Sequence, residues 1–162
     1  MRDFPGIVHD ASPNYRAGNK RKITCVILHA TATSGIVSPL EWLTSPQSKV
    51  SAHYLIGKDG KIYQLVDDED IAWHAGISYW RGKENVNTFS VGIELVNAND
   101  GKDSYPQAQI DACLGLCVAI CKDYGIRAAD VIGHKDIAPG RKTDPAGFPW
   151  DEFRGRLFDE GV

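Results

Sequence analysis

The run ITCVIL at residues 23–28 decides the fold class, because it is apolar and β-prone along its whole length. A strand with one solvated face alternates apolar and polar side chains, whereas a strand covered on both faces is apolar throughout. The sequence therefore predicts a buried strand over residues 23–28 that ends at His29. The run FSVGIELV at residues 89–96 predicts a second buried strand, in which Glu94 is the one ionisable residue.

Signals for a hairpin and a short helix lie between these two strands. The segments 53–56 and 61–66 are β-prone and flank a Lys58-Asp59-Gly60 turn, which predicts a β-hairpin. The segment Ser38-Pro39-Leu40-Glu41 predicts the start of a helix, with Ser38 as the N-cap and Glu41 completing a capping box.

The C-terminal half has the strongest helical pattern. Residues 106–124 are expected to form the longest helix, which ends at Gly125, and a last helix is expected from about Trp150. Strands interleaved with helices predict an α/β protein, a single domain with a central mixed β-sheet flanked by helices. Trp150 is assigned to the apolar core, as is Trp42 in the first helix.

Composition excludes several classes of protein. The chain has 162 residues, 43% of them hydrophobic and 24% charged, which is typical of one soluble globular domain. A formal net charge of −3 argues against a nucleic-acid partner. No window approaches the roughly 18 apolar residues of a membrane span, so no membrane insertion is expected. The N-terminal residues do not have the pattern of a signal peptide, which predicts a cytoplasmic protein.

Four polar positions are candidates for chemistry. His29 and His134 each follow an apolar run, and two histidines with one carboxylate would form a three-ligand zinc site, although a histidine at the end of a strand is more often structural or simply exposed. In an extended segment Lys142 and Asp144 point the same way, so they either face one site or form a solvated pair. Glu94 is costly among apolar neighbours unless it faces a polar cleft, where a raised pKa would suit a general base.

Four motifs in order change the weight of these alternatives. They are SAHYLI (51–56), AWHAG (72–76), SVGIEL (90–95) and GHKDIAPGRKTDP (133–145). The chain therefore resembles the type 2 N-acetylmuramoyl-L-alanine amidases over residues 22–154. The resemblance implies zinc-dependent hydrolysis of the amide between the lactyl group of N-acetylmuramic acid and L-alanine, in peptidoglycan or in soluble muropeptides. It also implies an amidase domain over residues 21–162, with residues 1–20 as an N-terminal extension packed on or near it.

The resemblance assigns roles to individual residues. The zinc ligands implied are His29, His134 and Asp144. Lys142 matches a lysine that stabilises the oxyanion, and Glu94 matches the acidic residue that activates water. Other branches of the family use a tyrosine as the base, and Tyr54 is the candidate here. The substrate contacts expected are His74, Tyr54 and Trp73.

The biological role is left open by the sequence. One possibility is a phage or prophage endolysin, made in the cytoplasm and released by a holin. The other is a cytosolic enzyme of cell-wall recycling. A competing function is a recognition module that binds peptidoglycan without cutting it, although such relatives typically lack the metal ligands. A monomer is expected.

Overall fold

A six-stranded mixed sheet forms the centre of the computed structural model, which describes residues 1–162. In spatial order its strands are β1 (Val8–His9), β5 (Ile62–Gln64), β4 (Tyr54–Ile56), β9 (Ser90–Leu95), β3 (Cys25–Ala30) and β10 (Val131–Gly133). The four strands from β4 to β10 are parallel to one another, whereas β5 pairs antiparallel with β4. Because β4, β9, β3 and β10 are parallel, their carboxyl ends lie along one edge of the sheet.

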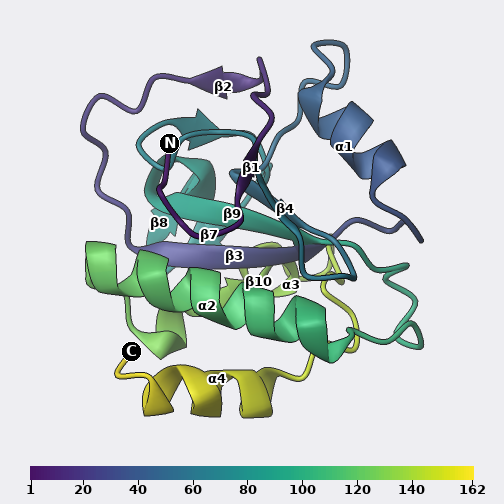
Figure 1. Cartoon of the computed structure of the whole chain (residues 1–162). Helices are drawn as coiled ribbons and strands as arrows, with labels where there is room; N and C mark the ends of the chain where they lie inside the picture. The colour runs from purple at the N-terminus through teal and green to yellow at the C-terminus, as the bar shows by residue number, and fades with distance from the viewer.

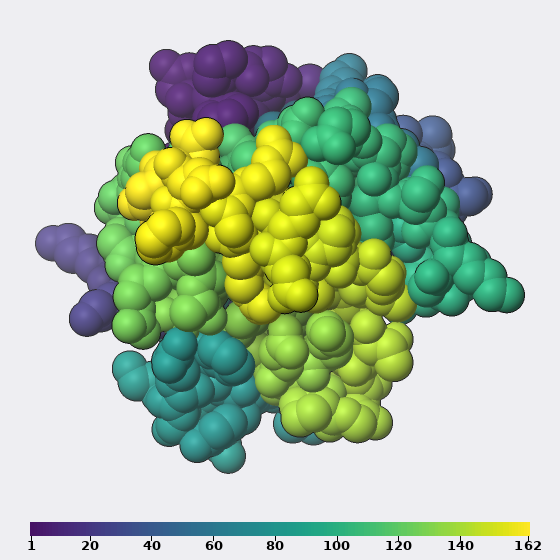
Figure 2. Space-filling view, turned by 90° about the horizontal axis from the view of Figure 1, so that it is seen from below, coloured from purple at the N-terminus to yellow at the C-terminus, as the bar shows by residue number.

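Helices cover the sheet on both faces (Figure 1). They are α1 (Val37–Thr44), α2 (Gln107–Tyr124), α3 (His134–Ile137) and α4 (Trp150–Asp159), with two 3₁₀ helices η1 (Val86–Phe89) and η2 (Ala128–Asp130). The long helix α2 crosses one face, and α4 packs beside α2 and against the edge strand β10, where the guanidinium of Arg154 donates to the carbonyl oxygen of Val131. Figure 2, seen from below, shows α4 lying across the middle of that face. The remaining strands form two small ladders, β2 (Tyr15–Arg16) with β6 (Ile71–Ala72) and β7 (Tyr79–Trp80) with β8 (Lys83–Glu84).

The alternation of side chains along β3 divides the molecule into a core face and a second face. Val26 and Leu28 point towards α2 and belong to the largest apolar cluster of the protein. Ile27 points the other way, into a smaller cluster with residues of η1 and α3. Since successive residues of a strand alternate between faces, His29 lies on the same face as Ile27. The β3–β9 register then places Glu94 beside His29.

Most of the elements expected from the sequence are confirmed, as is the fold class. The hairpin of β4 and β5 is present, and α2 ends at Gly125, whose φ of +67° is the left-handed conformation that glycine adopts without strain. The start of α1 differs from the expectation, because the helix begins at Val37 and Ser38 makes no capping hydrogen bond. The strand predicted over residues 23–28 runs from Cys25 to Ala30 and therefore includes His29.

The N-terminal residues add to the edge of the sheet, where Val8–His9 pairs in parallel with β5. The three cysteines of α2 at positions 113, 117 and 121 are buried in the main core, as small apolar side chains. No helix has the length and apolar character that crossing a bilayer requires.

Candidate metal centre

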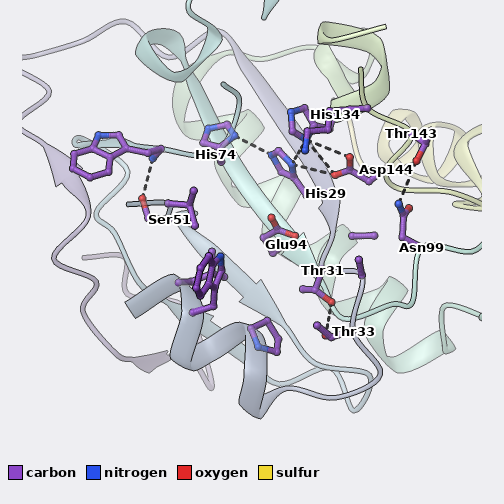
Figure 3. A pocket seen from close by; sticks show the side chains of 18 of the residues that line it. His29, Thr31, Thr33, Ser51, His74, Glu94, Asn99, His134, Thr143 and Asp144 are labelled. Carbon is purple, nitrogen blue, oxygen red and sulfur yellow. Dashed lines mark hydrogen bonds and ion pairs between the residues drawn. The ribbon is translucent and has the colours of Figure 1, made fainter. Parts of the chain in front are cut away.

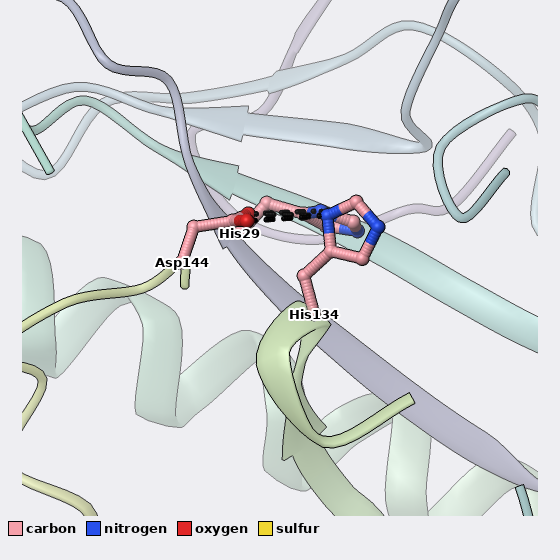
Figure 4. Close-up of side chains that lie close together, drawn as sticks. All are labelled: His29, His134 and Asp144. Carbon is pink, nitrogen blue, oxygen red and sulfur yellow. Dashed lines mark hydrogen bonds and ion pairs between the residues drawn. The ribbon is translucent and has the colours of Figure 1, made fainter. Parts of the chain in front are cut away.

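Three potential metal ligands meet at the carboxyl end of β3 (Figure 4). The Nδ1 atoms of His29 and His134 lie 3.0 Å apart. Oδ2 of Asp144 lies 3.3 Å from each of these two nitrogens. All three side chains are buried, so the ligand atoms are held by the protein interior.

The sheet explains how residues far apart in sequence meet here. The β10–β3 register pairs Gly133 with Leu28, so His134 follows directly alongside His29. The loop after α3 returns to the site, where the amide N–H of Lys135 donates to the carbonyl oxygen of Asp144 at 3.0 Å. That hydrogen bond holds Asp144 next to the two histidines. The spacing of the three residues in sequence gives no indication of this distance.

The protonation of the two histidines is compatible with a bound cation. Nε2 of His134 lies 3.0 Å from the carbonyl oxygen of Ala75, which can only accept, so this nitrogen carries the proton. Nδ1 of His134 therefore presents a lone pair. Burial lowers the pKa of His29 to about 4 and leaves its imidazole neutral, although the neighbouring Asp144 acts in the opposite direction.

The negative charge of Asp144 also favours a bound cation. Although burial acts to raise its pKa, the adjacent rings of His134 and His29 hold the pKa of this carboxyl well below its ordinary value. Two imidazole nitrogens and one carboxylate oxygen, separated by 3.0–3.3 Å, match the edges of a tetrahedron around zinc, which are about 3.3 Å for ligand bonds of about 2.0 Å. The donor set therefore fits a zinc ion with a fourth position open.

Glu94 is the ionisable group next to the three ligands (Figure 3). Its Oε2 is shielded from solvent and has no hydrogen-bond partner. Burial, followed by the negative charge of Asp144, raises the pKa of Glu94 to about 8, while Lys142 acts to lower it. A carboxyl group with this pKa exchanges a proton near neutral pH, as a general base must.

A cleft of about 530 Å³ opens above these residues. Besides the ligands and Glu94, it is lined by Lys142, Trp73, His74 and Trp42, and by residues that the sequence did not single out, Thr31, Asn99 and Arg141 among them. Lys142 is exposed, and its side chain has no hydrogen-bond partner within the protein. The structure thus brings seven of the eight candidate site residues together at one cleft.

Tyr54 is the exception, and the prediction that it contacts substrate or acts as the base is wrong. Its side chain is fully buried on the α2 face of the sheet, opposite the cleft. Its hydroxyl donates to Oδ1 of Asp68 at 2.6 Å and accepts from Nε2 of Gln64 at 3.1 Å. The side chains of His53 and Leu55 point away from this face, because residues of a strand alternate.

Trp42 is a second correction. The prediction placed it in the core, but its side chain on α1 is 58% exposed and forms part of the cleft wall. The helix turns Pro39 and Leu43 inwards instead. Trp150 is partly buried and packs against Phe148 at the edge of the main core, as expected.

Comparisons with known proteins identify the family that this chain resembles. The model of the N-acetylmuramoyl-L-alanine amidase family matches residues 19–147. The chain is 40% identical over 148 residues to the N-acetylmuramoyl-L-alanine amidase AmiD of Escherichia coli, covering 82% of this chain and 52% of that protein. A crystal structure of an AmpD derivative superimposes with a TM-score of 0.83 at 31% identity, covering 94% of both chains.

A complex of AmiD from E. coli with the substrate anhydro-N-acetylmuramic acid-L-Ala-D-γ-Glu-L-Lys is also similar. Its TM-score is 0.77 at 37% identity, with 87% of this chain and 58% of that chain covered. The present chain spans about half the length of the curated relative AmiD.

Proposed function

The chain belongs to the N-acetylmuramoyl-L-alanine amidase family, and we propose that it is a zinc-dependent amidase. Its reaction is hydrolysis of the amide between the lactyl group of N-acetylmuramic acid and the L-alanine of the stem peptide. The observation that carries the proposal is the convergence of His29, His134 and Asp144 beside the buried carboxyl group of Glu94.

His29, His134 and Asp144 would hold the zinc ion. When bound there, zinc supplies a Lewis acid that polarises the scissile carbonyl and lowers the pKa of water. The two histidines contribute neutral imidazoles and Asp144 contributes one negative charge, so the ion would keep a net positive charge towards the substrate.

Glu94 and Lys142 would perform the proton transfer and the charge stabilisation. Glu94 takes a proton from the attacking water and delivers it to the amine of L-alanine as the amide bond breaks. The unpartnered Oε2 is available for this proton because no protein group competes for it. The ammonium group of Lys142 stabilises the negative charge that develops on the carbonyl oxygen.

The substrate proposed is a muropeptide, soluble or within peptidoglycan. The structure of E. coli AmiD, 37% identical to this chain over the superimposed residues, is a complex with an anhydromuropeptide substrate. Trp73 and Trp42 line the cleft and offer aromatic surfaces to a sugar ring or a peptide. The complete ligand set together with Glu94 favours catalysis over recognition without cleavage.

The test is digestion of intact sacculi and of purified anhydromuropeptide, each with zinc and with a chelator, followed by mass analysis of the products. Zinc-dependent release of free stem peptide is the expected result, and re-addition of zinc after chelation should restore it. Cleavage of sacculi supports a lytic role, whereas cleavage of the soluble fragment alone supports recycling. If folded, zinc-loaded protein cuts neither substrate, the amidase proposal is wrong.

A further inference from the structure

His74 lies between the candidate metal site and the interior of the protein. Its Nδ1 is 2.9 Å from Nε2 of His29, and its Nε2 is 3.1 Å from the hydroxyl oxygen of Ser90. Both ring nitrogens are therefore engaged by protein groups. A substrate contact through either nitrogen, as the family resemblance implies, would require one of these hydrogen bonds to break.

The direction of the hydrogen bonds follows from one fixed acceptor. The hydroxyl of Ser90 donates to the carbonyl oxygen of Val86 at 2.7 Å, and a carbonyl oxygen can only accept. The single hydroxyl proton is thereby used, so Ser90 Oγ accepts from Nε2–H of His74. Nδ1 of His74 is then the unprotonated nitrogen of the ring.

The protonation of His74 also determines which nitrogen of His29 carries the proton. Because Nδ1 of His74 has a lone pair, Nε2–H of His29 donates to it across 2.9 Å. A neutral imidazole carries one proton, so Nδ1 of His29 is left with its lone pair. That lone pair faces Nδ1 of His134 and the carboxylate of Asp144.

The segment that carries His74 also orients the second histidine. The carbonyl oxygen of Ala75, the next residue, accepts from Nε2–H of His134 at 3.0 Å. The amide N–H groups of His74 and Ala75 both donate to Oδ1 of Asn87, at 3.1 and 2.8 Å, which fixes this segment in place. Two neighbouring residues thus determine the tautomers of both histidines.

We infer that His74, held by Ser90, is a positioning residue that sets the tautomer and ring orientation of His29 for metal binding, rather than a substrate contact. The inference rests on the proposed function, since it concerns the same metal site. Outer partners of this kind typically contribute 10- to 100-fold to metal affinity.

Zinc affinity of matched variants tests the inference, measured by competition with a chelator of known affinity. His74→Leu and His74→Asn have side chains of the same shape, but only Asn can accept from His29 near the position of Nδ1. We expect about 10- to 100-fold weaker zinc binding for His74→Leu and a loss of no more than about threefold for His74→Asn. Equal affinity of His74→Leu and wild type, or equal losses in both variants, would overturn the inference.

The nitrogen resonances of the histidines give a readout that does not depend on variants. In zinc-loaded, ¹⁵N-histidine-labelled wild-type protein, His74 should show a protonated Nε2 and an unprotonated Nδ1. The opposite tautomer overturns the inference even if every variant misfolds. Far-ultraviolet circular dichroism of each variant without metal separates loss of folding from loss of a ligand.

The outcomes for the positioning role and for the proposed function are distinct. Wild-type protein that binds zinc and cleaves muropeptide while His74→Leu binds zinc equally well refutes the positioning role alone. Wild-type protein that binds no zinc refutes the proposed function itself.

Discussion

The substitution Gly92→Ala probes the contact between the sheet and the ring of His74. Gly92 lies on β9 on the same face as Glu94, and the ring packs directly on its Cα. A Cβ added at this position would lie 2.5 Å from Cγ of His74 and 2.6 Å from its Nδ1. Carbon atoms in contact are normally about 3.5 Å apart, so the ring must shift by about 1 Å.

A shift of about 1 Å lengthens or tilts at least one of the two hydrogen bonds of the His74 ring, which span 2.9 and 3.1 Å. We expect overpacking to lower the free energy of unfolding by about 1–3 kcal/mol. We also expect zinc to bind about tenfold more weakly, because His29 is no longer held in its orientation.

The assay is urea unfolding and chelator competition on four proteins: wild type, Gly92→Ala, His74→Ala and the double variant. Removing the ring removes the clash, so Gly92→Ala should cost less than about 0.5 kcal/mol in the His74→Ala background. Gly115→Ala is the control, because its added Cβ meets only Phe4 at an ordinary 3.6 Å. If Gly92→Ala has the same cost in both backgrounds, the packing argument is refuted.

Three further predictions concern Glu94, Trp42 and His53. Glu94→Gln should lower kcat by about 10²- to 10⁴-fold, with zinc affinity unchanged within about threefold. The control Glu41→Gln, on the exposed side of α1, should leave both kcat and zinc affinity unchanged. Full activity in Glu94→Gln would exclude this residue as the base. Trp42→Ala should raise KM about tenfold, equivalent to about 1.4 kcal/mol of binding free energy, with kcat little changed. The control Phe158→Ala, which removes an exposed aromatic side chain on α4, should change neither KM nor kcat. An unaltered KM in Trp42→Ala would show that Trp42 does not contact the substrate. Burial, followed by the charge of Arg21, lowers the pKa of His53 to about 3. Below about pH 6.5 the unfolded chain therefore binds a proton at this residue that the folded protein does not bind. The free energy of unfolding consequently decreases as the pH falls from about 6.5 to 3. In urea unfolding between pH 4.5 and 7, His53→Asn should therefore show a slope smaller than that of wild type by up to about 1.4 kcal/mol per pH unit, and identical slopes would contradict the assignment.

The main elements of the fold were predictable because they depend on local patterns. The run at residues 23–28 is apolar without interruption and indeed forms the buried strand β3 beside β9. The five short strands β1, β2, β6, β7 and β8, of two residues each, were not predicted. Two residues are too few to show a period, and such strands form only because a partner strand lies next to them.

The site was predictable in its residue types and not in its geometry. His29 and His134 could be singled out because each ends an apolar run, but their separation of 3.0 Å depends on the β10–β3 register. The prediction for Tyr54 was wrong because the resemblance implies a tyrosine base without showing which face of the strand carries the side chain. In a strand neighbouring residues point to opposite faces, and the register decides which face is the cleft.

Trp42 was misplaced for a related reason. Pro39 and Leu43 are four residues apart and share the buried side of α1, whereas Trp42 is displaced from Leu43 by about 100° around the helix. The rotation of a short helix about its axis depends on what it packs against. No local signal in residues 37–44 distinguishes an inward from an outward tryptophan.

The arrangement of the sheet separates the residues that stabilise the fold from those that form the site. Val26 and Leu28 pack against α2, while His29, one residue further, points to the opposite face at the carboxyl end of the strand. Because β3, β9 and β10 are parallel, their carboxyl ends bring together His29 on β3, Glu94 on β9 and His134, which directly follows β10. A substitution at Glu94 can therefore alter catalysis without opening a cavity in the core, whereas Leu28→Ala should cost about 2–5 kcal/mol of stability without removing any ligand. The two faces of one strand thus carry two separable functions, and the alternation of its side chains is the physical reason.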